Sequence, residues 1–119
     1  MADRILKAPR NARTLLIWPA KAPDEVVERG FDWSDVLLSP AERARLAAGE
    51  TVTPADGIKA SSYVLPQGIV ASASSNTATV ALVTLTGGEL GRVYSVANRI
   101  ETAKGQQLER VVKLRIRAK

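Results

Sequence analysis

Residues Gly91–Ala118 read GRVYSVANRIETAKGQQLERVVKLRIRA and show the clearest side-chain periodicity in the chain. In the first half, Gly91–Thr102, three apolar residues share one face of a strand, Tyr94, Val96 and Ile100, and Arg92 near the strand start has the same parity. In the second half, Gln107–Ala118, Leu108, Val112, Leu114 and Ile116 share one face, and the opposite face carries Lys113, Arg115 and Arg117. Because the short turn Ala103-Lys104-Gly105 joins the halves, we predict an antiparallel hairpin with a ladder of cations on its outer surface.

The pattern of short strands extends back to residue 50. The runs at 50–54, 61–66, 68–74 and 77–85 are rich in Val, Thr, Ile and Tyr and are separated by Gly, Pro, Asn and Asp. No helix long enough for a crossover lies between them, so parallel pairing is disfavoured. The length of 119 residues suits one domain with one core. We therefore predict an all-β fold, an antiparallel sandwich of about seven strands.

The N-terminal third is less regular. We expect residues 1–17 to form an extended basic arm that is poorly ordered alone, and residues 18–119 to form the sandwich domain. Residues 14–30 contain Pro19 and Pro23 and are predicted to be irregular, while alternation over 31–36 predicts a short strand that buries Phe31 and Trp33. Ser39, Pro40 and Glu42 form a capping-box pattern, which predicts a short helix over about residues 40–48.

Composition excludes several kinds of chemistry. The chain has no cysteine and no histidine, which removes disulfides, thiol nucleophiles, ordinary zinc sites and a Ser-His-Asp triad. Its carboxylates form no convincing metal or acid–base cluster, and Ser61 and Ser62 after Lys59 match no nucleophile signature. Gly87-Gly88 is followed by a strand and not by a helix, so it is interpreted as a turn and not as a phosphate loop. We predict no enzymatic activity, no metal and no cofactor.

The charge distribution leaves two interpretations open. The net charge of +5 divides into +2 for residues 1–30, −2 for 31–88 and +5 for 89–119. A basic β-barrel that binds nucleic acid would use Lys113, Arg115 and Arg117 with Lys119, but no aromatic side chains alternate with these cations to stack on bases. A solvated strand face with a flexible arm is the simpler interpretation. Trp18 and Trp33 could likewise stack on a ligand, although burial is favoured because aromatics are scarce.

An ordered set of short motifs resembles a family of tailed-phage virion proteins, the phage fibre–tail adaptors. The motifs are WPAKAPDEV at 18–26, DWS at 32–34, GETV at 49–52, TGG at 86–88 with Gly91, YSVANRI at 94–100 and RVVKLRI at 110–116. The resemblance implies an immunoglobulin-like sandwich that joins tail or portal components to receptor-binding fibres without catalysis. The segment SPAERARLAA at 39–48 resembles an insertion into the family pattern, and the arm before Trp18 is longer and more basic than that pattern requires.

The resemblance also sets expectations for partners. Phage tail, portal or baseplate proteins and a tail-fibre protein are the expected partners, in a homo-oligomeric ring of the virion assembled in the bacterial host cytoplasm. A head–tail connector or capsid decoration protein remains an alternative, because similar sandwiches serve those roles. No apolar run is long enough to cross a membrane, and nucleic acid is not expected. The candidate partner-binding residues are Arg4, Lys7, Arg10, Arg13, Trp18, Lys113, Arg115 and Arg117.

Overall fold

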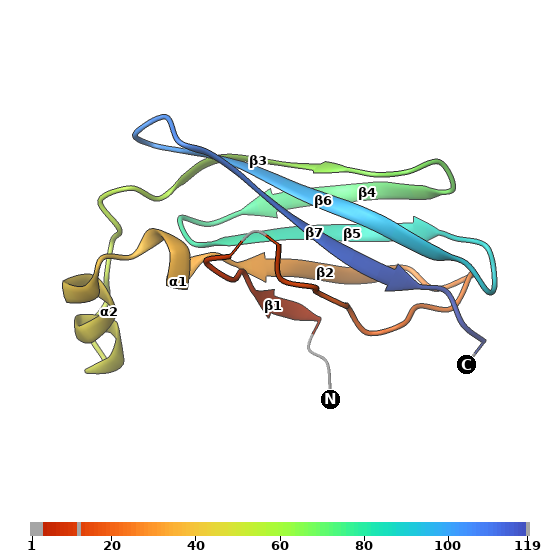
Figure 1. Ribbon diagram of the computed structural model, residues 1–119, viewed down its shortest axis with the longest axis horizontal. Coiled ribbons are helices and arrows are strands. Elements are labelled where there is room, and N and C mark those ends of the chain that lie inside the picture. The colour runs from red at the N-terminus through yellow and green to blue at the C-terminus, as the bar shows by residue number, and fades with distance from the viewer. Residues whose placement is uncertain (1–3, 12, 119) are drawn as a thin grey trace.

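Two β-sheets pack face to face in the computed structural model, which describes residues 4–11 and 13–118 (Figure 1). The strands are β1 (Ile5–Lys7), β2 (Val27–Asp32), β3 (Ile58–Val64), β4 (Ile69–Asn76), β5 (Val80–Gly87), β6 (Val93–Thr102) and β7 (Gln107–Arg115). One sheet has the order β1-β2-β5-β4 and the other β3-β6-β7. The prediction of an all-β sandwich is confirmed. Constant-type immunoglobulin domains have the same four-against-three order, but here β1 pairs with β2 in parallel.

The predicted hairpin is formed by β6 and β7. Tyr94 lies opposite Leu114, and Val96 lies opposite Val112, in one continuous antiparallel register. These four side chains are buried, and the alternate residues of both strands face outward. The alternation read from the sequence therefore assigns both faces of this hairpin correctly.

Aromatic side chains fill the centre of the core. Trp18, Phe31 and Trp33 are completely buried, and the ring of Phe31 lies 5.5 Å from Trp18 and 6.3 Å from Trp33. The indole of Trp18 donates a hydrogen bond to the Gly30 carbonyl at 3.2 Å, which satisfies its one polar group inside the core. Burial, the favoured interpretation for both tryptophans, is confirmed.

Two short helices follow β2. The predicted capping box is present at the start of α2 (Pro40–Ala47), where the Ser39 hydroxyl accepts from the Glu42 amide and the Glu42 carboxylate accepts from the Ser39 amide. The predicted strand over 31–36 is wrong at its end. The Asp32 carboxylate accepts from the Ser34 amide at 2.9 Å and turns the chain into α1 (Ser34–Leu37). The strand predicted over 50–54 is also wrong, because those residues form a loop.

The expected free arm is not seen in the described residues. The Ile5–Lys7 strand pairs with β2, the Ala8 amide donates to the Asp32 carbonyl at 2.8 Å, and the Ala8 side chain is completely buried. The chain then crosses to the second sheet, where the Arg110 guanidinium donates to the carbonyls of Pro9 (2.7 Å) and Arg10 (3.2 Å). Residues 1–3 and 12 of the expected arm lie outside the described residues.

Residues 16–21 continue along the free edge of β7. The Lys113 amide donates to the Leu16 carbonyl, and the Lys113 carbonyl accepts from the Trp18 amide. Further on, the Lys21 amide donates to the Arg115 carbonyl at 3.0 Å. We call residues 4–11 and 13–21 the N-terminal cover, because they close the long side of the sandwich between β2 and β7. The expected boundary after residue 17 falls inside this cover. Among the described residues, no helix is long and apolar enough to span a membrane.

Candidate functional site

The solvent side of the β3–β6–β7 sheet is the best candidate for contact with another protein, and we call it the outer sheet face. The strand register places Val64, Ala97 and Val111 side by side across this face. Val64 and Val111 are 44% and 43% exposed, and Val93 on the same face is 57% exposed. Single apolar side chains are common on surfaces, but a row of them across one sheet is typical of a protein–protein contact.

The N-terminal cover widens this apolar area at the β7 edge. Ile17 forms a parallel bridge with Lys113 and is 41% exposed, while Leu15, two residues earlier, is 72% exposed. Trp18, the next residue, points into the core because side chains alternate in an extended segment. The cover thus adds Leu15 and Ile17 to the exposed apolar side chains of the sandwich.

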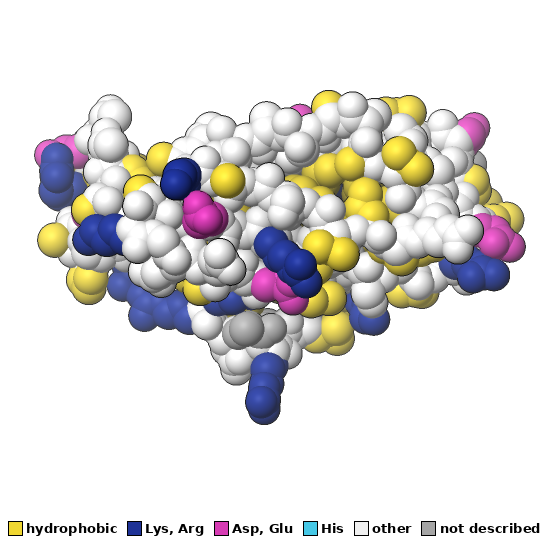
Figure 2. All heavy atoms as spheres, turned by 90° about the horizontal axis from the view of Figure 1, so that it is seen from above, with side chains coloured by type: hydrophobic (Ala, Val, Ile, Leu, Met, Phe, Trp, Pro, Cys, Tyr) yellow, Lys and Arg dark blue, Asp and Glu magenta, His cyan; other side chains and the backbone are white. Residues whose placement is uncertain are grey.

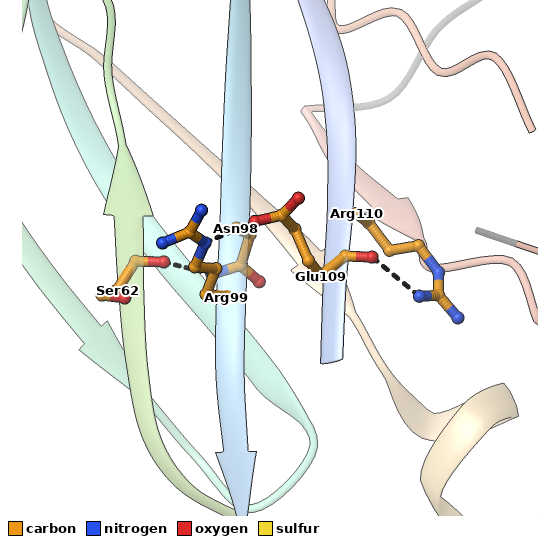
Figure 3. Close-up of polar contacts among 5 residues, drawn as sticks. All are labelled: Ser62, Asn98, Arg99, Glu109 and Arg110. Carbon is orange, nitrogen blue, oxygen red and sulfur yellow. Dashed lines mark hydrogen bonds and ion pairs between the residues drawn. The ribbon is translucent and has the colours of Figure 1, made fainter. Parts of the chain in front are cut away.

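Charged side chains border the apolar row. Figure 3 shows Arg99 of β6 reaching Glu109 of β7, where the two form an ion pair. On the other side of the row, the Lys113 ammonium donates to the Ser95 hydroxyl. Because these groups are largely exposed, the ion pair contributes little to stability, on the order of 0–1 kcal/mol. Their effect is to surround the apolar row with polar groups, as in the rim of an interface.

A buried amide network lies behind this face. Asn98 is completely buried, and its amide group donates to the Ser61 hydroxyl and to the Ser62 carbonyl, both at 3.0 Å (Figure 3 shows the second contact). Its side-chain oxygen accepts from the Trp33 indole at 2.9 Å. This network ties β3 to β6 and links the sheet to the residue that follows β2. Sequence reasoning named Asn98 only within the family motif at 94–100 and did not predict its burial or its partners.

The predicted partner-binding residues comprise two groups of cations at the surface and one buried tryptophan. Lys113, Arg115 and Arg117 lie on or just beyond β7, and Arg115 and Arg117 are exposed. The exposed cations Arg4, Lys7, Arg10 and Arg13 lie on the N-terminal cover. Trp18 is completely buried, so the structure does not support a direct role for it in binding a partner. Lys119, the last cation of the proposed ladder, lies outside the described residues.

Two cations of the cover are held by its own domain. The Arg10 guanidinium donates to the Asp35 carbonyl at 3.2 Å, and Arg4 lies 4.0 Å from the Glu28 carboxylate. The Arg110 guanidinium, which binds the cover, also lies 5.1 Å from the centre of the Trp33 ring. Burial lowers the pKa of Arg110. Sequence reasoning placed Arg110 only in a family motif and missed its role in fastening the cover.

Lys21 is a second residue whose role the sequence did not reveal. It is completely buried, and its ammonium donates to the carbonyls of Ala22 (2.8 Å), Pro23 (3.4 Å) and Gly87 (2.6 Å). Burial lowers the pKa of Lys21 despite the nearby Glu25 and Asp24. A buried ammonium is stable only when its N–H groups all donate hydrogen bonds. Through these bonds Lys21 forms a clamp, by which we mean that it connects the cover to the Gly87 carbonyl at the end of β5.

The described residues show no arrangement suited to catalysis or metal binding. An open depression of about 540 Å³ lies beside the Arg99–Glu109 pair and includes Ser61 and Ser62. Ser61 accepts from Asn98, and the Lys59 ammonium lies 3.5 Å from the Glu101 carboxylate, so no lysine activates either serine. Within residues 4–11 and 13–118 no group of three or more carboxylates could hold a metal ion.

Comparison with known proteins gives one family. A family model described as podophage GP4 fiber-tail adaptor protein gp77 matches residues 21–115, which is most of the chain. No curated protein matches the chain in sequence. The matched region begins at Lys21 and includes all strands from β2 to β7, while β1 and most of the N-terminal cover precede it.

Proposed function

Because the chain belongs to the podophage GP4 fiber-tail adaptor family, we propose that it joins tail or portal components of the virion to a tail-fibre protein. The family gives the chain a structural role in the phage tail. A rigid sandwich suits this role, because an adaptor must hold two other proteins at a fixed distance and orientation. We further propose that its copies are arranged as a ring, since a head-to-tail contact repeated around an axis closes into one.

The outer sheet face is the observation that supports a docking role most directly. It combines the exposed row of Val64, Ala97 and Val111 with a border of charged side chains, and the Asn98 network behind it limits its movement. Apolar centres with polar borders are characteristic of protein interfaces. We propose that one of the neighbouring virion proteins binds here.

Nucleic acid is not proposed as a partner. Lys113 donates to Ser95, and the residues between the cations of β7 point into the core, as Leu114 and Ile116 do. The face therefore offers no aromatic platform between its positive charges on which bases could stack.

The test compares two substitutions in the phage that encodes the chain. Val111→Asp places a charge in the middle of the apolar row, whereas Leu46→Asp changes a similarly exposed apolar residue on α2 and is the matched control. We expect Val111→Asp to remove either this protein or the fibre from purified particles, and Leu46→Asp to leave both in place. Circular dichroism of the purified variants checks that each is folded.

Three outcomes are distinguished. If Val111→Asp removes this protein or the fibre from particles and Leu46→Asp does not, docking through the outer sheet face is supported. Particles with normal content of this protein and of fibre in both variants show that the face is not the docking site. Purified wild-type particles that lack this protein, or that retain their fibres when its gene is deleted, contradict the adaptor role itself.

A further inference from the structure

The four edges of the two sheets are not protected equally. The β7 edge is covered by residues 16–21 through main-chain hydrogen bonds, and the β1 edge is only three residues long. The β3 edge has a register shift at Lys59, whose charge faces Glu101. Natural proteins use such covers, short strands, bulges and lysines to prevent unwanted strand pairing. β4 also has a register shift, but among the described residues it has no main-chain cover and no charged side chain, and it is longer than β1.

β4 is a long edge strand without charge. Its sequence IVASASSN has eight residues, no Lys, Arg, Asp, Glu or Pro, and every residue after Ile69 is exposed. A register shift between Ala71 and Ala73 leaves Ala73–Asn76 as its regular part. Figure 2 looks onto the side where β3 and β4 lie and shows a broad area of uncharged side chains and backbone, with most charged groups at the ends and along the lower border.

The direction of the main-chain groups of β4 follows from its pairing with β5. The Thr77 amide donates to the Val80 carbonyl at 2.8 Å. Since hydrogen-bonded and non-hydrogen-bonded pairs alternate in an antiparallel ladder, the Ser75 main chain faces β5, whereas the main-chain amides and carbonyls of Ser74 and Asn76 point away from the sheet. These outward groups can pair with a further strand.

We propose that two copies of this chain pair through β4, antiparallel and about a two-fold axis that passes beside Ser75. In this register Ser74 of each copy lies opposite Asn76 of the other, so that the outward amides and carbonyls bond in pairs. The two sheets that contain β4 then join into one sheet across the dimer. The pairing concerns the free protein and does not rest on the proposed function.

Charge and size favour a second copy over a foreign strand. With a net charge of +5, two copies repel each other, and they approach most easily through a surface that carries no charge. The regular part of β4 contains only Ala, Ser and Asn, so either face of the strand meets small neutral side chains when it pairs with itself. A closed two-fold contact uses the same patch twice, which separates it from the head-to-tail contact of a ring.

Light scattering and two variants of Ser74 test the pairing. The wild-type chain is expected to form a dimer whose fraction rises with concentration. Ser74→Pro removes one outward amide without disturbing the ladder to β5, and proline is tolerated at such edge positions, so this variant should be monomeric and folded. Ser74→Ala keeps the amide and should remain dimeric. A monomeric wild-type protein, larger oligomers only, or a dimeric Ser74→Pro variant would each overturn the proposal.

Cross-linking tests the register, since the natural chain contains no cysteine. Two Ser75→Cys side chains would face each other across the axis in a non-hydrogen-bonded pair, with their Cα atoms roughly 4.5 Å apart, a separation that permits a disulfide. Under mild oxidation this variant should form a covalent dimer much faster than Val111→Cys, whose thiol lies on the outer sheet face. Equal rates, or faster cross-linking of Val111→Cys, would contradict pairing through β4.

Discussion

Replacing Lys21 with methionine is expected to destabilise the domain strongly, although methionine fills nearly the same space. The wild-type ammonium is completely buried and donates to three carbonyls, two of them at 2.8 Å or less, those of Ala22 and Gly87. Leaving a buried carbonyl without its partner costs about 1–3 kcal/mol, so the two short bonds correspond to about 2–6 kcal/mol. The variant no longer buries a charge, which offsets part of this loss, and we expect a net decrease of about 2–4 kcal/mol in the free energy of unfolding.

Urea denaturation followed by tryptophan fluorescence measures this change, because Trp18 and Trp33 are both buried in the folded state. Lys113→Met is the matched control, since Lys113 is only partly buried and makes one side-chain hydrogen bond. We expect this control to stay within about 0.5 kcal/mol of wild type, as surface substitutions usually do. If Lys21→Met is no less stable than Lys113→Met, the clamp formed by the buried ammonium does not stabilise the fold.

Two further predictions concern buried and exposed hydrogen bonds. Asn98→Ala removes the acceptor of the Trp33 indole and leaves the Ser62 carbonyl without its donor. We expect the free energy of unfolding to fall by about 2–4 kcal/mol, measured by thermal denaturation. An unchanged midpoint temperature would contradict the role of the network. Hydrogen bonds from the Ser39 and Ala55 amides lower the pKa of Glu42 below 4.5 in the folded state. The ionised carboxylate therefore stabilises the folded state fully above pH 4.5, and this stabilisation is lost as the pH falls through the pKa of the folded state. The stability difference between wild type and Glu42→Gln should therefore shrink on acidification in denaturation experiments, and a constant difference would refute this assignment.

Local signals in the sequence predicted the elements that depend on local interactions. The capping box at Ser39 involves residues three positions apart, and the alternation in β6 and β7 reflects one buried and one exposed face. Both can be read from neighbouring residues. The prediction failed where a side chain competes with the local pattern, as at Asp32, whose carboxylate starts α1 after a strand-like alternation.

Contacts between distant segments were beyond sequence reasoning. The basic N-terminus has no periodicity of its own, and its position depends on Arg110, which binds the Pro9 carbonyl from 101 residues further along the chain. Lys21 and Asn98 are buried polar residues whose side chains donate hydrogen bonds to carbonyls of distant strands, those of Gly87 in β5 and Ser62 in β3. The outer sheet face was predicted in part, through Lys113 and Arg115, but its apolar row depends on the register of three strands.

The fastening of the cover to β7 has a consequence for biosynthesis. Residues 16–21 are translated long before β7 and depend on it for main-chain hydrogen bonds, since Leu16 and Trp18 bond to Lys113. During translation these amides and carbonyls, and the indole surface of Trp18, have no β7 to cover them. The domain therefore reaches its native state only after β7 has been synthesised, and such non-local pairing makes folding slow.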